Sequence, residues 1–382
     1  MHFQKKPANR RAAKANRQVE RVLNQLIRGV DGALRTTRLG GRKANYDDVA
    51  YHFEGGKGEV MRRKHYDKSL RLLWKAEDQA PWSSFRDSSK LERRLRKAAM
   101  EAMTDEEKAA HERISLPEYK EMLNKEYTER EKQAIVAILT AIGHGEAYAW
   151  LVAAELLAEV KSTGAKAALT MQVMEEAKHF VVLRELIHAF DVPVPRQSVW
   201  EYVLLENVYK SKGLDKLFGM NILVEGVAMS LFGLVSTLPG LEVLHYFHRD
   251  EARHMGLPAN YLREFPLSWW QRNNPMARAR RLKLFGPAVA LIPFLEEDLA
   301  ELGVDAFDFA GSVLRKLTLV AERNGFVLPI PRTFLMHTLD RVFNLYCHAT
   351  REGHEFRAFS AVETTIGERE LQAEGEIWAA LA

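Results

Sequence analysis

The sequence predicts an all-α protein, and three observations support this fold class. No stretch of the 382 residues alternates apolar and polar side chains convincingly, as a half-buried strand would. Apolar residues recur instead at helical spacing in long segments, which proline and glycine separate. Two Glu-x-x-His sequences, 176–179 and 251–254, each place a carboxylate and an imidazole on one helix face, because residues three apart are neighbours there.

The chain begins with a basic arm. Residues 1–45 contain 12 Lys/Arg and 2 Asp/Glu, whereas the remainder contains 43 and 49. Six apolar residues of the arm repeat at helical spacing and predict a basic amphipathic helix: Val19, Val22, Leu23, Leu26, Ile27 and Val30. The simplest interpretation is a helix packed on the body with its cationic face in solvent. Docking of an acidic partner protein, a nucleic acid or a membrane surface stays open, as does an organellar transit peptide.

Composition limits the cellular setting and the kinds of site. The single cysteine, Cys347, excludes a disulfide framework and any cluster held by several thiolates. It fits a reducing environment, and we expect a cytoplasmic protein. The best candidate for a membrane helix, residues 136–160, contains His144, Glu146 and Glu155, so we interpret it as a core helix and expect no transmembrane segment.

The centre of the chain predicts two helical hairpins. The first hairpin consists of a helix over 129–160, a break at 161–164 and a second helix that ends at about 190. A third helix starts at 199, breaks at 211–213 and resumes over 214–237. After the Pro239-Gly240 turn, a fourth helix continues to about 264. The tail, about 275–382, is expected to be helical, with interruptions at Pro287, Pro293, Pro329 and Pro331. We therefore predict three regions: a basic arm and helical extension (1–125), a four-helix core (126–266) and a C-terminal helical extension (267–382).

The spacing of glutamates along the hairpins predicts a two-metal site. A di-metal bundle needs one Glu from each of two helices and Glu-x-x-His from each of the other two. Glu146 and Glu225 precede Glu176 and Glu251, and the midpoints of the two pairs fall at the expected turns, near residues 161 and 238. Four carboxylates converging in a dry interior would repel one another, and two cations relieve that repulsion. Mixed carboxylate and imidazole ligands suit iron or manganese.

We also predict which residues near the candidate ligands support the site and which lie away from it. Glu175 and Asp250 directly precede the motif glutamates and are expected to orient the imidazoles. Gly143, Gly145 and Gly226 flank the candidate ligands, where they either leave space for oxygen or substrate or permit close helix packing. A third match, Glu185 to His188, lies about half a turn out of phase and should point away from the site.

The segments 175–179 and 250–254 resemble the paired acidic-Glu-x-Arg-His motifs of the ferritin-like di-iron carboxylate superfamily. The resemblance covers roughly residues 129–264 and is closest to bacterial ferritin-like di-iron proteins of unassigned activity. It implies a ferritin-like four-helix bundle with helical N- and C-terminal extensions. It also implies two iron ions, or a manganese/iron pair, with Glu176 and Glu251 bridging the complete ligand set of Glu146, Glu176, His179, Glu225, Glu251 and His254.

At two positions the sequence differs from known subfamilies of this superfamily. Leu183 stands where the ribonucleotide reductase small subunit carries its radical tyrosine. Phe247 stands where arylamine N-oxygenases carry a third histidine ligand, and the adjacent His248 is either an extra ligand or a hydrogen-bonding residue at the rim.

The resemblance implies a di-iron oxidase or monooxygenase that activates O2 to hydroxylate, desaturate or N-oxygenate an organic substrate, free or carrier-bound. Such an oxidoreductase needs an external reductase, because the sequence encodes no other redox group. An acidic carrier protein is a candidate partner for the basic arm. The C-terminal extension suits a substrate lid or a homodimer interface, and we expect a homodimer. The alternative is a ferroxidase or a non-catalytic iron-binding protein.

Overall fold

The computed structural model describes residues 9–37, 105, 116, 118–160, 163–328 and 330–351, and within these ranges the chain is helical, without strands. The all-α prediction is therefore confirmed. The elements, in chain order, are α1 (Arg10–Thr37), α6 (Tyr119–Glu126), α7 (Glu129–Glu159), α8 (Thr163–Ile187), α9 (Val199–Lys210), α10 (Gly213–Phe218), the π-helix η3 (Gly219–Val224), α11 (Glu225–Val235), α12 (Leu244–Glu264), α13 (Trp269–Asn273), α14 (Pro275–Glu301), α15 (Ala306–Arg323) and α16 (Arg332–Thr350).

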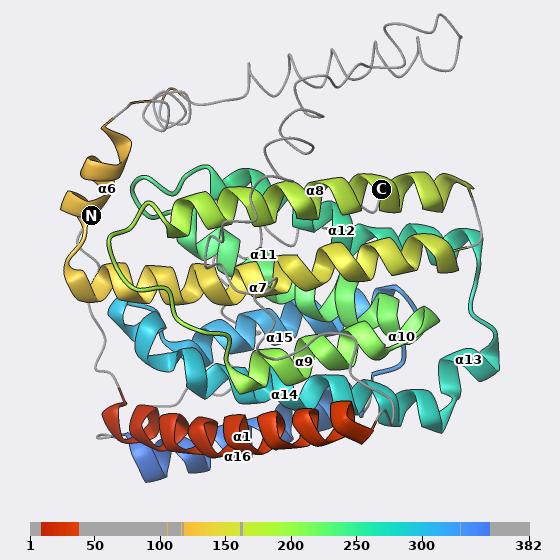
Figure 1. Cartoon of the computed structure of the whole chain (residues 1–382). Coiled ribbons are helices and arrows are strands. Elements are labelled where there is room, and N and C mark those ends of the chain that lie inside the picture. The colour runs from red at the N-terminus through yellow and green to blue at the C-terminus, as the bar shows by residue number, and fades with distance from the viewer. Residues whose placement is uncertain are drawn as a thin grey trace, which may run out of the picture. The chain divides into compact units, whose positions relative to one another are not determined.

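The chain divides into two compact units, residues 1–52 with 120–382, and residues 53–119. Almost all of the second unit lies outside the described residues. The first unit contains α1, the central helices and the C-terminal helices (Figure 1). Its core is one continuous cluster of buried apolar side chains, which runs from α7 to α16. The central helices are therefore embedded in a larger helical assembly.

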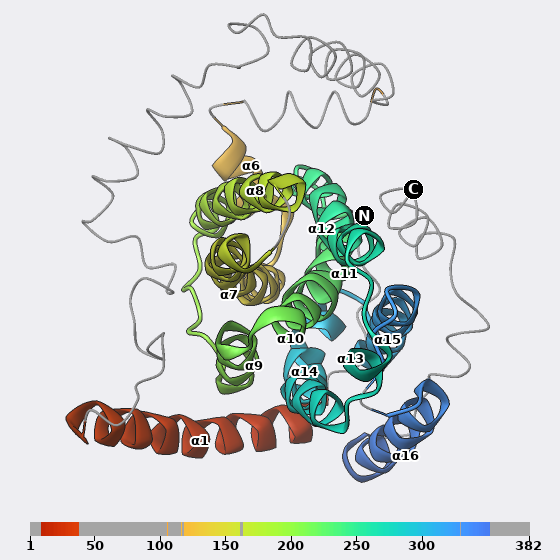
Figure 2. The ribbon, with the colours of Figure 1, turned by 90° about the vertical axis from the view of Figure 1, so that its right-hand side faces the viewer.

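Four central helices form the two predicted hairpins. Helix α7 packs along α8 and α11 along α12, while α8 contacts α12 and α7 contacts α11 (Figure 2). Helix α7 begins with a capping box, in which the Thr128 side chain accepts from the Glu131 N–H and the Glu131 side chain accepts from the Thr128 N–H. The turns fall between α7 and α8 and between α11 and α12, as their sequences predict.

The segment before α11 differs from the prediction. A continuous helix was expected from 214 to 237, but α10, the π-helix η3 and α11 share this stretch. Every residue of η3 is buried. A π-turn inserts one extra residue into a helical turn and shifts the face of the residues that follow, and such turns are frequent at functional sites. Here it lies immediately before Glu225.

Helix α14 contradicts the predicted interruptions at Pro287 and Pro293, because it runs through both from Pro275 to Glu301. An interior proline costs about 3 kcal/mol of helix stability. Helix α14 packs against α1, α7, α9 and α15. Packing against these neighbours outweighs the local preference of proline. The predicted interruption near Pro331 is confirmed, since that residue precedes α16, whereas Pro329 lies outside the described residues.

Helix α1 lies against α14 and α9, so the basic arm does pack on the body. Its predicted orientation is only partly correct. Leu23 and Ile27 are half-buried, whereas Val19, Val22 and Leu26 are exposed to solvent. The predicted apolar face is therefore divided between the body and the surface.

Two helical stretches are long and apolar enough to cross a membrane by length and composition alone. They are Glu129–Glu159 and Gly213–Val235, and 78% and 83% of their most apolar windows are buried inside the protein. Core helices of soluble proteins have the same composition, so these two stretches are weak evidence for a membrane span.

Candidate metal centre

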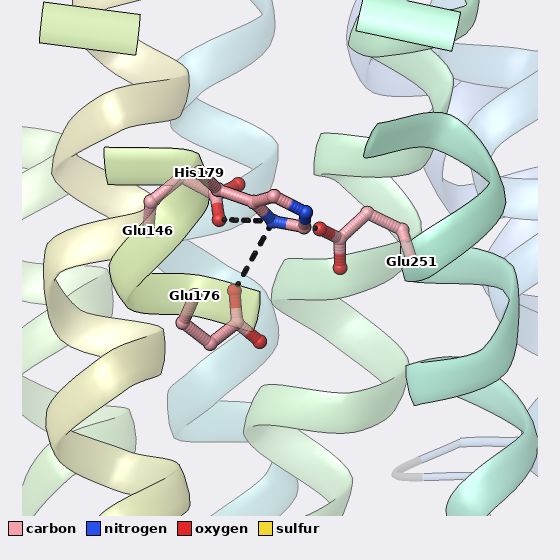
Figure 3. Close-up of side chains that lie close together, drawn as sticks. All are labelled: Glu146, Glu176, His179 and Glu251. Atoms are coloured by element: carbon pink, nitrogen blue, oxygen red, sulfur yellow. Dashed lines mark hydrogen bonds and ion pairs between the residues drawn. The ribbon is translucent and has the colours of Figure 1, made fainter. Parts of the chain in front are cut away.

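The six predicted ligands converge between the two hairpins. They form two groups that could each hold a metal ion: Glu146, Glu176, His179 and Glu251 in one, and Glu176, Glu225, Glu251 and His254 in the other. Within each group, one potential ligand atom from each residue lies within 4.8 Å of all the others. Figure 3 shows the first group, whose side chains reach one another from three helices. Glu176 and Glu251 belong to both groups.

Helical periodicity explains the convergence. Helix α7 contributes Glu146 and α11 contributes Glu225, while α8 and α12 each contribute a Glu-x-x-His pair from one face. All six side chains lie in the interior, with a relative exposure of at most 3%. Carboxylates are rarely buried without a partner. Four of them at one place therefore need cationic neighbours.

The two shared glutamates extend between the two histidines. The oxygens of Glu251 lie 3.0 Å from His179 Nδ1 and 3.0 Å from His254 Nδ1. The oxygens of Glu176 lie 3.6 Å and 3.1 Å from the same two nitrogens. Among the described residues, Glu176 Oε2 and Glu251 Oε1 are buried and make no hydrogen bond of regular geometry, and their nearest cationic contact is His179 Nδ1 at 3.6 and 3.0 Å. These oxygens are available to an ion, so the residues fit a carboxylate-bridged metal pair.

The outer nitrogens of the histidines are bonded across the two hairpins. His179 on α8 makes a 3.0 Å contact from Nε2 to Asp250 on α12, and His254 on α12 makes a 3.0 Å contact from Nε2 to Glu175 on α8. Arg253 contacts both carboxylates, at 2.8 Å from Glu175 and 2.5 Å from Asp250. These contacts direct both Nδ1 atoms inward, which is how carboxylates orient metal-binding imidazoles. Glu175 and Asp250 thus lie where the sequence placed them, each beside the opposite histidine.

Burial and charge divide the four glutamates into two pairs. Burial, together with repulsion from Glu176 and Glu251, raises the pKa of Glu146 and Glu225 well above its usual value. Burial acts in the same direction on the shared pair, but the two histidines outweigh it. They hold the pKa of Glu176 well below its usual value and lower that of Glu251 to about 2.

The histidines respond in the opposite sense. Burial alone would lower the pKa of His179 and His254, but hydrogen bonds and charges from the surrounding carboxylates raise both well above the usual value. For Asp250, burial is likewise outweighed by His179, Arg253 and Lys178, and its pKa is lowered. Protons on the imidazoles therefore balance part of the negative charge among these side chains. Two divalent cations would balance four ionised glutamates completely.

Two amides that the sequence interpretation missed support the second group. Gln172 donates from Nε2 to Glu176 Oε1 and to Glu225 Oε1, both at 3.0 Å. Asn221, in the π-helix, donates to Gln172 Oε1 at 2.9 Å and to the His254 carbonyl at 3.2 Å. Gln172 precedes Glu176 by four residues, so the same helical periodicity could have identified it. No signal of this kind identifies Asn221, because its position depends on the π-helix.

The remaining candidates lie outside the two groups. His248 donates from Nδ1 to the Met229 carbonyl at 2.9 Å, and the structure does not bring it to the ligand cluster. Phe247 stacks on His179, with ring centroids 4.2 Å apart. Glu185 and His188 are both exposed, in agreement with their predicted orientation away from the site.

The flanking glycines have different surroundings. A Cβ added to Gly226 would lie 2.1 Å from Leu317 Cδ2 and 3.1 Å from Met255 Cε, so this glycine permits close packing of α11 against α15 and α12. At Gly145 the nearest atom would be Val224 Cγ1 at 3.8 Å, an ordinary contact. Of the two interpretations offered for the glycines, the packing one applies to Gly226.

No family model, curated protein or solved structure matches this chain. The buried cluster can therefore be interpreted only from its own geometry and chemistry.

Proposed function

We propose that this chain is a ferritin-like di-iron protein that activates O2 to oxidise an organic substrate. The observation that carries the proposal is the pair of ligand groups that share Glu176 and Glu251. A centre with two ions needs carboxylates that reach both, and a single-ion site does not. Mixed carboxylate and imidazole ligands favour iron, with a manganese/iron pair as the variant of this assignment.

The residues would divide the work as follows. Glu146 with His179 and Glu225 with His254 would hold one ion each, and Glu176 and Glu251 would hold both. Asp250 and Glu175 keep the imidazoles in place through their hydrogen bonds. Phe232 and Phe247 pack edge and face on His179 and keep water away from it. When bound, a di-iron pair supplies the reduction of O2, which side chains alone do not perform.

An apolar cavity on the side of α11 that faces away from the ligands supports the proposal of an organic substrate. It is lined entirely by apolar side chains of η3, α11, α14, α15 and α16, and its volume is about 80 Å³. Leu223 and Val227 line it, two residues before and two after Glu225, so they lie on the helix face opposite that glutamate. Leu317 also lines it and packs on Gly226 beside Met255, the neighbour of His254. Oxidation of iron alone requires no such cavity, whereas an apolar substrate does.

The proposed reaction balances with an external reductant. For hydroxylation, the substrate and O2 take up two electrons and two protons and yield the alcohol and water, with one oxygen atom entering each product. The described residues include no second redox group, since the only cysteine, Cys347, is single and buried. The two electrons must therefore come from a separate reductase.

Metal stoichiometry and O2 use test the proposal. Protein purified from iron-replete cells should contain about two irons per chain, as a carboxylate-bridged site requires. When it is supplied with a chemical reductant and ¹⁸O₂, the protein should consume O2 and incorporate ¹⁸O into members of a panel of apolar acids and amines. Replacement of Ala310, which lines the cavity, by Trp should retain the irons and abolish incorporation.

Two outcomes would contradict the proposal. Uptake of many irons per chain, with O2 consumed in proportion to iron and no oxidised organic product, would identify a ferroxidase. Absence of bound metal in folded protein would mean that the six side chains form a polar contact between hairpins.

A further inference from the structure

Helix α1 presents an apolar row to solvent. Val19, Val22, Leu26 and Val30 are 47%, 57%, 58% and 48% exposed. Their spacing of three, four and four residues places them on one face of the helix. A row of large apolar side chains on a monomer surface marks an interaction site more often than isolated ones do.

A different face of α1 attaches the helix to the body, and it does so through polar groups. Asn16 Nδ2 donates to the Pro293 carbonyl at 3.0 Å. Glu20 accepts from the Val199 N–H at 3.2 Å, and Asp31 accepts from the Tyr202 hydroxyl at 3.2 Å. The helix is thus fixed with its apolar row outward.

A cationic row runs along the same helix. Lys14, Arg21 and Arg28 follow one another at seven-residue spacing and are exposed. On a helix, this row lies about a quarter turn from Val22 and between about a third and half a turn from Leu26 and Val30, so the two rows flank the side of α1 that faces away from the body. The acidic residues of α1, Glu20 and Asp31, both bond to the body. The outer surface of α1 therefore combines apolar and cationic side chains.

Helix α16, on the same side of the unit as α1, adds a second exposed apolar row. Phe334, Val342 and Leu345 are 62%, 51% and 69% exposed, and their spacing of eight and three residues places them on one face. Both views show α1 and α16 on the same side of the central helices (Figures 1 and 2). Asn9, before α1, donates to Thr350 at the end of α16 at 2.6 Å. The exposed Arg341 adds a further cation.

We propose that α1 and α16 together form a docking surface for an anionic phospholipid bilayer. With an apolar row and a cationic row on its exposed side, an interfacial helix can insert apolar side chains while its basic residues reach lipid phosphates. A second copy of the chain fits less well, because it would cover the apolar row of α1 and leave the cationic row in solvent, since Glu20 and Asp31 both bond to the body. A nucleic acid would use the cations and leave both apolar rows in water.

Vesicle co-sedimentation of the full chain tests the proposal. The protein should bind vesicles of phosphatidylcholine with phosphatidylglycerol and not vesicles of phosphatidylcholine alone, and binding should fall as salt rises. Val22→Asp with Leu26→Asp should abolish binding. Lys14→Glu, Arg21→Glu and Arg28→Glu together should weaken it on the order of a hundredfold. A matched reversal of three exposed basic residues elsewhere, Lys125→Glu, Arg272→Glu and Lys283→Glu, should leave most of the binding intact.

Unchanged circular dichroism and melting temperature would show that the variants are folded, which is expected because the substituted side chains are exposed. Three results would overturn the proposal: no vesicle binding by the wild-type chain, equal binding by wild type and both α1 variants, or a dimer in light scattering that Leu26→Asp dissociates without any vesicle binding. Metal content is measured separately, so the metal proposal and this one can fail independently.

Discussion

The two hairpins present equivalent ligands, but the helices that carry these ligands differ in backbone conformation. In the first, α7 is an uninterrupted helix of 31 residues with Glu146 near its middle. In the second, the π-helix η3 ends immediately before Glu225, the first residue of α11. The pairs Glu176–His179 and Glu251–His254 lie on ordinary α-helices in both hairpins. A short motif thus keeps its geometry within one helix, whereas the position of a single glutamate depends on the helix that precedes it.

The largest expected effect is the loss of bound iron, and it should differ between the glutamates that belong to both ligand groups and those that belong to one. Glu176→Ala or Glu251→Ala removes a ligand of both groups, so each variant should lose about two irons per chain. Glu146→Ala or Glu225→Ala removes a ligand of one group and should leave about one iron. Elemental analysis measures this, with the exposed Glu185→Ala as the control. Equal losses in all four variants would show that the two groups do not act as separate ion sites.

Acid should weaken metal binding strongly. Ions bind the ionised glutamates and neutral imidazoles, while the raised pKa values of Glu146, Glu225, His179 and His254 favour protons on these groups. Metal binding must therefore release protons, and each proton released changes the Kd by about tenfold per pH unit. Affinity should rise as pH rises.

Calorimetry in two buffers of different ionisation enthalpy counts the released protons. Glu146→Gln and Glu225→Gln should each release fewer protons than the parent protein, because glutamine has no proton to lose. A difference between these two variants would show that the hairpins are electrostatically unequal. Proton release unchanged in both would contradict the raised pKa values.

A smaller effect is expected from the crossed hydrogen bonds. Asp250→Asn should loosen His179, and Glu175→Gln should loosen His254, with a loss of roughly 10–100-fold in metal affinity for each. Competition with a chelator measures this loss, and the exposed Glu185→Gln is the matched control. Since each carboxylate acts on the histidine of the other hairpin, Glu175→Gln should affect the ion held with Glu225. Affinity equal to the parent in both variants would contradict the positioning role.

The smallest effect compares the two glycines. Gly226→Ala places a Cβ 2.1 Å from Leu317 Cδ2, and overpacking of this kind costs about 1–3 kcal/mol of unfolding free energy. Gly145→Ala meets only Val224 at 3.8 Å and should stabilise the helix by up to about 1 kcal/mol. Urea denaturation of both variants measures the difference. Equal stabilities would show that Leu317 moves aside at no cost.

The hairpins and the gathering of the ligands could be predicted because they depend on local rules. Spacing of three residues fixes each Glu-x-x-His pair, and the position of the turn fixes which glutamate faces it. Phe247 and His248 show the limit of such reasoning. Their adjacent positions did not reveal that the first stacks on His179 and the second bonds to the Met229 carbonyl.

Tertiary packing explains the features that local rules missed. Helix α14 continues through Pro287 and Pro293 because it packs against neighbours on several sides, which no single segment reveals. The same holds for α1. Its periodicity predicted an amphipathic helix, but the sequence does not say that hydrogen bonds of Glu20 and Asp31 to the body turn Val22 and Leu26 outward.

Because the ligands come from both hairpins, the metal centre can form only after a certain length of the chain has been synthesised. Both ligand groups draw on both hairpins, and the final ligand of the second group is His254. A nascent chain that has emerged only as far as α8 has one imidazole and two of the four glutamates, without their partners. Metal loading with the full ligand set must therefore follow synthesis of α12, which makes it a late step that reports completed assembly of the core.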